Sequence, residues 1–394
     1  MALNKFSITV CMALALLWGC TVDSGQSPFT AKQYFPTRDP ILPTITIYKE
    51  QQSPYQFEPS PLHLDPRSVK FTWHNKPKTV DEALKETNTD ALIVLKDGKL
   101  VYERYFTQNP VSIHRLYSVT KSFAGLMAAT LIHEGKMKRS DPITHYVPEL
   151  KGTAYDQATI SNLLEQTVGA QFNENYLDPT AEIIRFSMAA LIGPQSSIRK
   201  ALQRIHPKGE NGKKLHYMTP NLDTLCWVSE RASHRTFPNW LNKTLWSKMG
   251  MARNAHIITD SHQVGFCGGG LEATAIDLAK VGQMLLQEGF FNGQQLIPRQ
   301  VIQEITRGGD KQVFAHGDAM LFKDRQESYQ DNFWLNDDHH GTFYARGIYG
   351  QWIYIDPLTR VVIVKLSSQN TPKSVDLLRK TILALEAISR HFSK

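Results

Sequence analysis

The chain has 394 residues, 41% of them hydrophobic and 21% charged, which is typical of a globular protein with a sizeable core. The formal net charge of +7 is spread along the sequence without a long run of Lys or Arg, which argues against nucleic-acid binding. No group of Cys and His residues has the spacing of a metal site, and neither a metal nor another cofactor is expected.

The first twenty residues have the layout of a secretory signal. Lys5 precedes an apolar run, Phe6 to Trp18, that is too short to span a bilayer. The run ends in Leu17-Trp18-Gly19-Cys20, which resembles a bacterial lipobox, where the Cys is lipidated and becomes the mature N-terminus. Residues 1–19 are therefore predicted to be a lipoprotein signal peptide and Cys20 the lipidation site. A plain signal peptide with an incidental Cys is the alternative.

Lipidation at Cys20 would attach the protein to a membrane through several acyl chains. Thr21 stands where lipoproteins of the bacterial inner membrane often carry Asp, so we expect the outer membrane, with the domain facing the periplasm. Residues 20–75 are rich in Pro, Ser, Thr and Gln and predict a linker or a loosely packed strap. Of the remaining cysteines, Cys226 and Cys267 can pair in an oxidising compartment, and two buried free thiols are the alternative.

Regular structure is expected from residue 76 to the end. The first elements are a short amphipathic helix near 79–87 and two strands, 91–96 and 99–105, joined by the hairpin signal Asp97-Gly98. From Ser118 to about residue 310 the apolar spacing is mostly helical. Helices are expected within 159–169, 181–193, 221–233 and 274–289.

Strands return over 351–368 around a turn at Asp356-Pro357, and a helix over 374–392 closes the chain. Strands therefore lie at both ends of the domain and helices fill its middle. This order predicts an α/β (α+β) fold. An antiparallel sheet from the N- and C-terminal strands is flanked by helices, and a helical lobe is inserted at about 140–310.

Two Ser-x-x-Lys patterns occur, Ser118 to Lys121 and Ser197 to Lys200, and chance alone yields about one in a chain of this length. Ser118 precedes an almost wholly apolar helix that must be buried on all sides, whereas Ser197 precedes an amphipathic, basic one. Only Ser118 is therefore expected in a desolvated cleft at a helix N-terminus.

Residues three apart share a helix face, so the Lys121 amine can reach the Ser118 hydroxyl. Burial and the positive helix end lower the pKa of Lys121, and a neutral Lys can take the Ser proton. Backbone N–H groups at the same end can stabilise an oxyanion. In the alternative interpretation, Ser118 is an N-cap and Lys121 extends to solvent.

Three stretches resemble, in the same order, the three sequence elements of the serine β-lactamase-like superfamily. They are LYSVTKSF with the Ser-x-x-Lys, LHYMTPNLD with Tyr217 just before a helix, and YARGIYGQW at the head of a strand. The similarity covers about residues 85–390. TDALIVLKDGKLVYERYF and FCGGGLEATAIDLAKVGQMLL look like the branch containing 6-aminohexanoate-dimer hydrolase, which is related to class C β-lactamases and family VIII esterases.

This resemblance implies the serine β-lactamase-like (DD-peptidase) fold, with Ser118 as the nucleophile, Lys121 as its base and Tyr217 as the proton relay to the leaving group. It also implies an oxyanion hole formed by the backbone N–H groups of Ser118 and Ile348. Substrate contacts would come from Tyr176, Arg346 and Gly347. For Tyr176, an aromatic side chain that packs in a loop is the alternative.

The sequence departs from the superfamily pattern at two places. Ala345, followed by Arg346, stands where Lys-Thr-Gly has its Lys, and Tyr217-Met218-Thr219 lacks the Asn found in class C β-lactamases. Strand neighbours point to opposite faces, so if Ala345 faces the cleft, Arg346 faces away and no cation lies there. We therefore expect weak turnover of β-lactams.

The resulting hypothesis is a lipid-anchored serine hydrolase that cleaves a small-molecule amide or ester through an acyl-enzyme, without a cofactor or nucleic-acid partner. A penicillin-binding carboxypeptidase or β-lactamase acting on peptidoglycan-like substrates is the second hypothesis. An inactive envelope-binding lipoprotein is a third, from a different class of protein. No oligomeric state is predicted.

Overall fold

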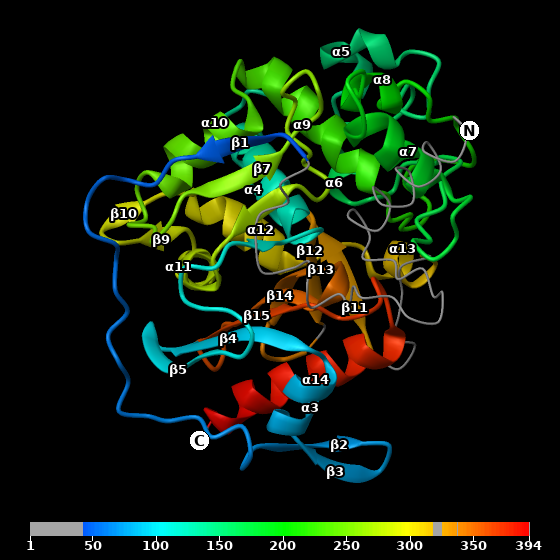
Figure 1. Ribbon diagram of the computed structural model, residues 1–394. Coiled ribbons are helices and arrows are strands. Elements are labelled where there is room, and N and C mark those ends of the chain that lie inside the picture. The colour runs from blue at the N-terminus through cyan, green and yellow to red at the C-terminus, as the bar shows by residue number, and fades with distance from the viewer. Residues whose placement is uncertain (1–41, 318–324, 337, 394) are drawn as a thin grey trace, which may run out of the picture.

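The computed structural model describes residues 42–317, 325–336 and 338–393 (Figure 1). The predicted signal peptide 1–19 and Cys20 lie outside the described residues. Among the described residues, no helix has both the length and the apolar character needed to cross a membrane.

The centre of the molecule is a seven-stranded antiparallel sheet with the order β11-β12-β13-β14-β15-β4-β5. β4 and β5 come from the N-terminal part of the domain, whereas the other five strands come from its C-terminal part. The two parts meet where β4 pairs with β15, with Val94 opposite Ile363, and β5 pairs with β4. The expected sheet of N- and C-terminal strands is thereby confirmed. Its strands are β4 (Thr89–Lys96), β5 (Lys99–Tyr105), β11 (Glu327–Gln330), β12 (Phe333–Asn336), β13 (Phe343–Gly347), β14 (Gln351–Asp356) and β15 (Val361–Ser367).

Helices cover both faces of this sheet (Figure 1). On one face lie α3 (Val80–Glu86) and α14 (Val375–His391), and on the other lie α4 (Val119–His133) and α11 (Ala275–Leu286). The strands alternate accordingly, because successive side chains point to opposite faces. On β4, Ile93 packs with the α4 side and Val94 with the α14 side.

The segment between α4 and β11 is mostly helical, as predicted. Its longest member, α9, runs beside α4 and buries most of its side chains. The helices are α5 (Ile143–Tyr146), η1 (Pro148–Leu150), α6 (Ile160–Leu164), α7 (Glu182–Leu191), α8 (Ile198–Leu202), α9 (Thr219–Ser233), α10 (Phe237–Leu241), the π-helical η2 (Asn242–Trp246), α12 (Arg299–Arg307) and α13 (Lys311–Ala315).

A second, four-stranded sheet in the order β1-β7-β8-β6 was not predicted. Its strands are β1 (Thr44–Ile47), β6 (His114–Arg115), β7 (Ala255–Ile258) and β8 (Leu271–Ala273). They have two to four residues each, too few to show an alternating pattern in the sequence. A small hairpin, β9 (Phe290–Phe291) and β10 (Gln294–Gln295), also lies in this region.

The N-terminal strap contacts the domain at several points. Its first strand, β1, pairs with β7, and the Tyr55 ring lies 4.9 Å from that of Phe291. The strap then leads into the hairpin of β2 (Lys70–Trp73) and β3 (Lys76–Thr79), which packs near α14. The strap thus lies along the domain between residues 42 and 75.

Candidate active site

The two Ser-x-x-Lys patterns have different roles in the structure. Ser197 is the N-cap of α8, and its hydroxyl accepts a hydrogen bond from the Lys200 backbone N–H at 3.3 Å. Ser118 precedes the first turn of α4 but its side chain makes no capping hydrogen bond. Its Oγ instead accepts a hydrogen bond from Lys121 Nζ at 2.9 Å. The expected difference between the two patterns is therefore observed.

Lys121 is enclosed by the protein, with 1% of its surface exposed. Besides Ser118 Oγ, its ammonium donates to Thr219 Oγ1 at 3.1 Å and to the carbonyl of Gly268. Burial lowers the pKa of Lys121 to about 8, although the charges of Glu174 and Asp223 act to raise it. An amine of this kind can accept a proton from an adjacent hydroxyl near neutral pH.

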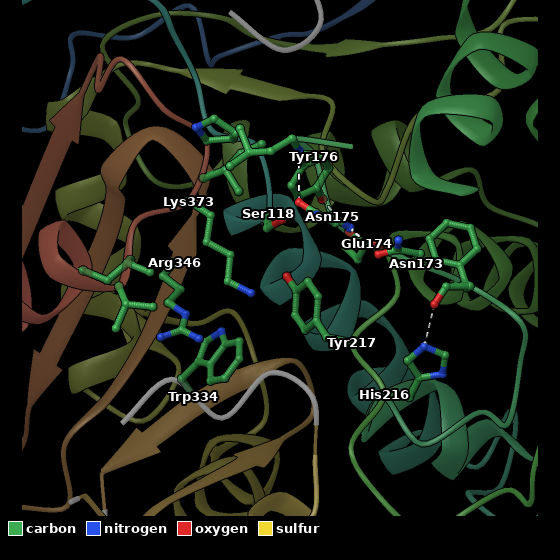
Figure 2. Close-up of a pocket in the computed structure, with 17 residues that line it drawn as sticks. Ser118, Asn173, Glu174, Asn175, Tyr176, His216, Tyr217, Trp334, Arg346 and Lys373 are labelled. Atoms are coloured by element: carbon green, nitrogen blue, oxygen red, sulfur yellow. Dashed lines mark hydrogen bonds between the residues drawn. The ribbon is translucent and has the colours of Figure 1, made fainter. Parts of the chain in front are cut away.

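Tyr217 lies on the other side of Ser118, and its phenol points toward the serine (Figure 2). Its ring centroid is 5.2 Å from Lys121 Nζ and 5.7 Å from the Trp334 ring, on which it stacks. Burial raises the pKa of Tyr217, while its hydrogen bond with Ser118 and the charge of Arg346 act to lower it. The phenol is therefore protonated at neutral pH and can donate.

The start of α4 and the end of β13 meet at Ser118. A Cβ added to Gly347 would lie 3.2 Å from the Ser118 backbone N and 2.5 Å from the Leu116 carbonyl, so only glycine permits this approach. Ser118, Gly347 and Ile348 border the same pocket. Tyr117, next to the serine, has φ of 48°, a left-handed conformation that is strained for a non-glycine residue.

The expected orientation, with Ala345 facing the cleft and Arg346 facing away, is wrong, although Arg346 lies at the pocket as the resemblance implied. Ala345 packs in the core on the α4 side of β13, whereas Arg346 lines the pocket with its guanidinium 3.5 Å from the Trp334 ring centroid. The strand does alternate, but its phase is the reverse of the one assumed. Phe343 pairs with Ile355 and Ala345 with Ile353, and these apolar residues pack against the helices.

A second cation, Lys373, lines the pocket from the segment between β15 and α14, on the same side as Arg346 (Figure 2). No sequence motif pointed to it. The cleft therefore contains two basic side chains, of which the sequence resemblance had named Arg346 alone as a substrate contact.

Tyr176 lies in the pocket as expected, and its hydroxyl donates to Glu174. Glu174 also accepts the backbone N–H of Thr219 at 2.9 Å and the Thr219 hydroxyl. Neither Glu174 nor Thr219 was singled out from the sequence, although each lies two residues from a tyrosine that was. Their proximity to those tyrosines was the only available signal.

Behind Lys121, the loop before β8 is joined to α9. Asp223 Oδ1 accepts the Gly268 backbone N–H at 3.0 Å, and Cys267 forms a disulfide with Cys226, which settles the alternatives for these cysteines. Burial raises the pKa of Asp223 to about 8. These two links hold the Gly268 carbonyl, which accepts a hydrogen bond from Lys121.

The pocket has a volume of about 440 Å³, enough for a small organic molecule. Its walls combine the polar groups above with apolar side chains. The lining residues are Ser118, Phe172, Asn173, Glu174, Asn175, Tyr176, Leu177, His216, Tyr217, Trp334, Arg346, Gly347, Ile348, Pro372, Lys373, Val375 and Leu378. Within the described ranges, no group of three or more His, Cys, Asp or Glu residues could hold a metal ion.

The model of the beta-lactamase family matches residues 78–387, and the chain belongs to that family. The 6-aminohexanoate-dimer hydrolase of Paenarthrobacter ureafaciens is 30% identical over 359 residues, covering 89% of each chain. The chain is thus a hydrolase of the serine β-lactamase family, as predicted.

Solved structures agree with this assignment. A Bacillus anthracis protein, provisionally assigned as a 6-aminohexanoate-dimer hydrolase, superposes with a TM-score of 0.79 at 26% identity, covering 89% of this chain and 91% of that one. EstCE1, a hydrolase with promiscuous acyltransferase activity, superposes with a TM-score of 0.61 at 15% identity, covering 79% and 98%. The second similarity concerns the fold alone.

Proposed function

We propose that this protein hydrolyses amide or ester bonds of small molecules through an acyl-enzyme formed on Ser118. The observation that carries the proposal is the 2.9 Å hydrogen bond between Lys121 Nζ and Ser118 Oγ at a buried site. Burial lowers the pKa of Lys121 to about 8, so a fraction of the enzyme holds the neutral base at neutral pH.

In acylation, Lys121 takes the Ser118 proton while Oγ attacks the substrate carbonyl. The backbone N–H groups of Ser118 and Ile348 stabilise the oxyanion. Tyr217 donates its phenolic proton to the leaving nitrogen or oxygen and regains one from Lys121. Water then attacks the acyl carbonyl while neutral Lys121 takes its proton, and Lys121 returns that proton to Ser118 Oγ as the acyl bond breaks.

Activity-based labelling tests this proposal. A fluorophosphonate is expected to modify Ser118, as mapped by mass spectrometry, and p-nitrophenyl butyrate to be hydrolysed. Ser118→Ala is expected to lower kcat by at least about a thousandfold, because no nucleophile remains. The matched control is Ser197→Ala, which should keep the parent rate. Parent activity in Ser118→Ala would refute the mechanism, whereas a parent protein with neither labelling nor turnover would favour the inactive envelope-binding lipoprotein.

Arg346 and Lys373 favour a second candidate, the hydrolysis of carboxylate-bearing amides such as β-lactams or peptidoglycan-like peptides. A carboxylate in a partly buried cleft needs a paired charge to offset its desolvation, and two cations line the same side of this pocket. The earlier reason for expecting weak β-lactam turnover, an absent cation, does not hold.

Kinetics on nitrocefin and p-nitrophenyl butyrate, measured side by side, distinguish the two candidates. If the cations bind the substrate carboxylate, Arg346→Ala and Lys373→Ala each lower kcat/KM for nitrocefin by about tenfold to a hundredfold, the size of one charged hydrogen bond. Hydrolysis of the uncharged ester should change far less. Equal losses on both substrates would exclude selection by charge.

A further inference from the structure

The carboxylate of Glu174 is fully engaged by groups of the active site. Its Oε2 accepts the backbone N–H of Thr219 at 2.9 Å, and its Oε1 accepts the hydroxyls of Thr219 and Tyr176. Glu174 lies in the loop between α6 and α7, whereas Thr219 is the first residue of α9. Figure 2 shows Glu174 beside Tyr176 at the edge of the pocket, close to Ser118. A carboxylate that accepts several hydrogen bonds is held in one orientation.

The same threonine contacts the proposed base. Thr219 Oγ1 accepts a hydrogen bond from Lys121 Nζ at 3.1 Å and donates its own proton to Glu174. The hydrogen bonds therefore run in one direction, from the ammonium through the hydroxyl to the carboxylate. The Tyr176 hydroxyl lies beside this path, 3.4 Å from Thr219 Oγ1.

Lys121 must lose a proton before it can act as a base, and its three acceptors differ in what they can do. The Gly268 carbonyl accepts a hydrogen bond but cannot pass a proton on, and Ser118 has to give a proton rather than receive one. In the described part of the chain, Thr219 is the acceptor of Lys121 whose own hydroxyl donates a hydrogen bond to a carboxylate, that of Glu174.

We propose that Glu174 is the proton acceptor of Lys121 and that the Thr219 hydroxyl carries the proton between them. This inference rests on the proposed function. One N–H bond of Lys121 breaks as that proton binds Thr219 Oγ1, and the original Thr219 hydroxyl proton moves to Glu174 Oε1. The products are a neutral amine and a neutral carboxylic acid, and Glu174, which lines the pocket, then gives its proton to solvent, so the site as a whole loses one proton. The amine then accepts the Ser118 proton as Oγ bonds to the substrate carbonyl carbon, whose π electron pair moves onto oxygen.

The surroundings of Lys121 suit this transfer. Desolvation disfavours an ammonium at a fully enclosed site, so replacing the ion pair by two neutral groups relieves that penalty. The charged groups that face Lys121 are Glu174 from its loop and Asp223 from α9, and the Tyr217 ring closes the third side. Arg346 acts on Tyr217 from β13. Asp223 accepts the Gly268 backbone N–H and, among the described residues, forms no hydrogen bond with Lys121 or Thr219, so this path does not lead to it.

The test compares Thr219→Val, Thr219→Ser and Glu174→Gln with the parent, using p-nitrophenyl butyrate turnover and the rate of fluorophosphonate labelling at Ser118 across pH 6–10. Thr219→Val removes the hydroxyl at almost constant volume and should lower both rates by about a hundredfold, the usual contribution of a positioned proton carrier. Thr219→Ser should restore most of the rate, because its hydroxyl keeps the path. Circular dichroism and thermal melts show that each variant is folded.

Glu174→Gln should lower the maximal rate similarly. It should also move the acidic limb of kcat/KM to lower pH, because one negative charge facing Lys121 is removed, an effect that a merely structural role would not produce. Parent rates in Thr219→Val or Glu174→Gln, or an equal loss in Thr219→Ser, would overturn the relay. Ser118→Ala, run in parallel, separates the two claims: if it alone is inactive, the proposed function stands and the relay fails.

Discussion

Lys121 illustrates how one buried side chain sets the chemistry of the whole site. An exposed Lys is charged and useless as a base at neutral pH, but enclosure among Ser118, Thr219 and Gly268 brings the pKa of Lys121 to about 8. The same three groups fix the amine at hydrogen-bonding distance from the serine oxygen. Position and protonation state therefore have a common cause.

The pH dependence follows from this pKa. Neutral Lys121 is the active form and its protonated form predominates below about pH 8, so kcat/KM for an uncharged ester should rise with pH and level off above that value. On the acidic side of the profile, below about pH 8, the rate should fall about tenfold per pH unit, as expected for one essential deprotonation. Rates of p-nitrophenyl butyrate hydrolysis from pH 5.5 to 9.5 measure this, corrected for spontaneous hydrolysis. A flat profile across this range would contradict the role of Lys121 as base.

The Ser118–Lys121 pair could be recognised from sequence because the two residues are close neighbours in the chain. Ser118 and Lys121 meet through helical spacing alone. Thr219 and Glu174 reach Lys121 only through tertiary packing, across 98 residues in the case of Thr219. No local pattern reports such a contact, and Glu174 was therefore missed.

At the scale of elements, β13 shows that the sequence of one strand alone does not determine which face of the sheet each side chain points to. The neighbouring strand, β14, is needed for that assignment. Phe343 to Gly347 is buried throughout, so the sequence offers no exposed face from which to determine the phase. Pairing with β14 places Ala345 opposite Ile353 and Arg346 opposite Trp352, and the apolar pair packs beneath the sheet. The helices α7, α9, α11 and α14 were predictable because each is at least ten residues long and carries apolar residues at helical spacing. The four short strands of the second sheet had no such signal.

The disulfide between α9 and the loop before β8 should affect stability more than catalysis. It closes a loop spanning 41 residues, and the loss of such a link costs about 4 kcal/mol of unfolding free energy in the chain-entropy estimate. Asp223 still holds Gly268 without it. The Cys226→Ser/Cys267→Ser variant should therefore melt at a lower temperature while keeping kcat within about threefold of the parent.

Dithiothreitol provides the control for this prediction. Under denaturing pretreatment, it should lower the melting temperature of the parent toward that of the double variant and leave the variant unchanged. A double variant that melts like the parent but has lost its activity would show that the disulfide instead positions the Gly268 carbonyl, which accepts a hydrogen bond from Lys121.

For the molecule as a whole, a disulfide in the core of the site agrees with a protein that folds outside the reducing cytoplasm. Attachment to a membrane through Cys20 remains a proposal. Cys20→Ser should release the protein from the membrane fraction, or block its processing, without changing p-nitrophenyl butyrate turnover by the domain. Fractionation followed by mass spectrometry of the N-terminus measures this. A parent protein that is soluble and without acyl chains would contradict the lipobox assignment and leave a plain signal peptide.

The strand order of the central sheet has a consequence for the newly made chain. β4 and β5 are synthesised early, yet β4 pairs with β15, which ends at Ser367. Until that residue has emerged, the N-terminal hairpin lacks its permanent neighbour, and the wall carrying Arg346 and Ile348 cannot dock on Ser118. Contacts between such distant segments form slowly, because a long loop must close first. Ser118 therefore gains its complete surroundings only after Ser367 has been synthesised, and a chain interrupted before that residue is an incomplete and inactive hydrolase.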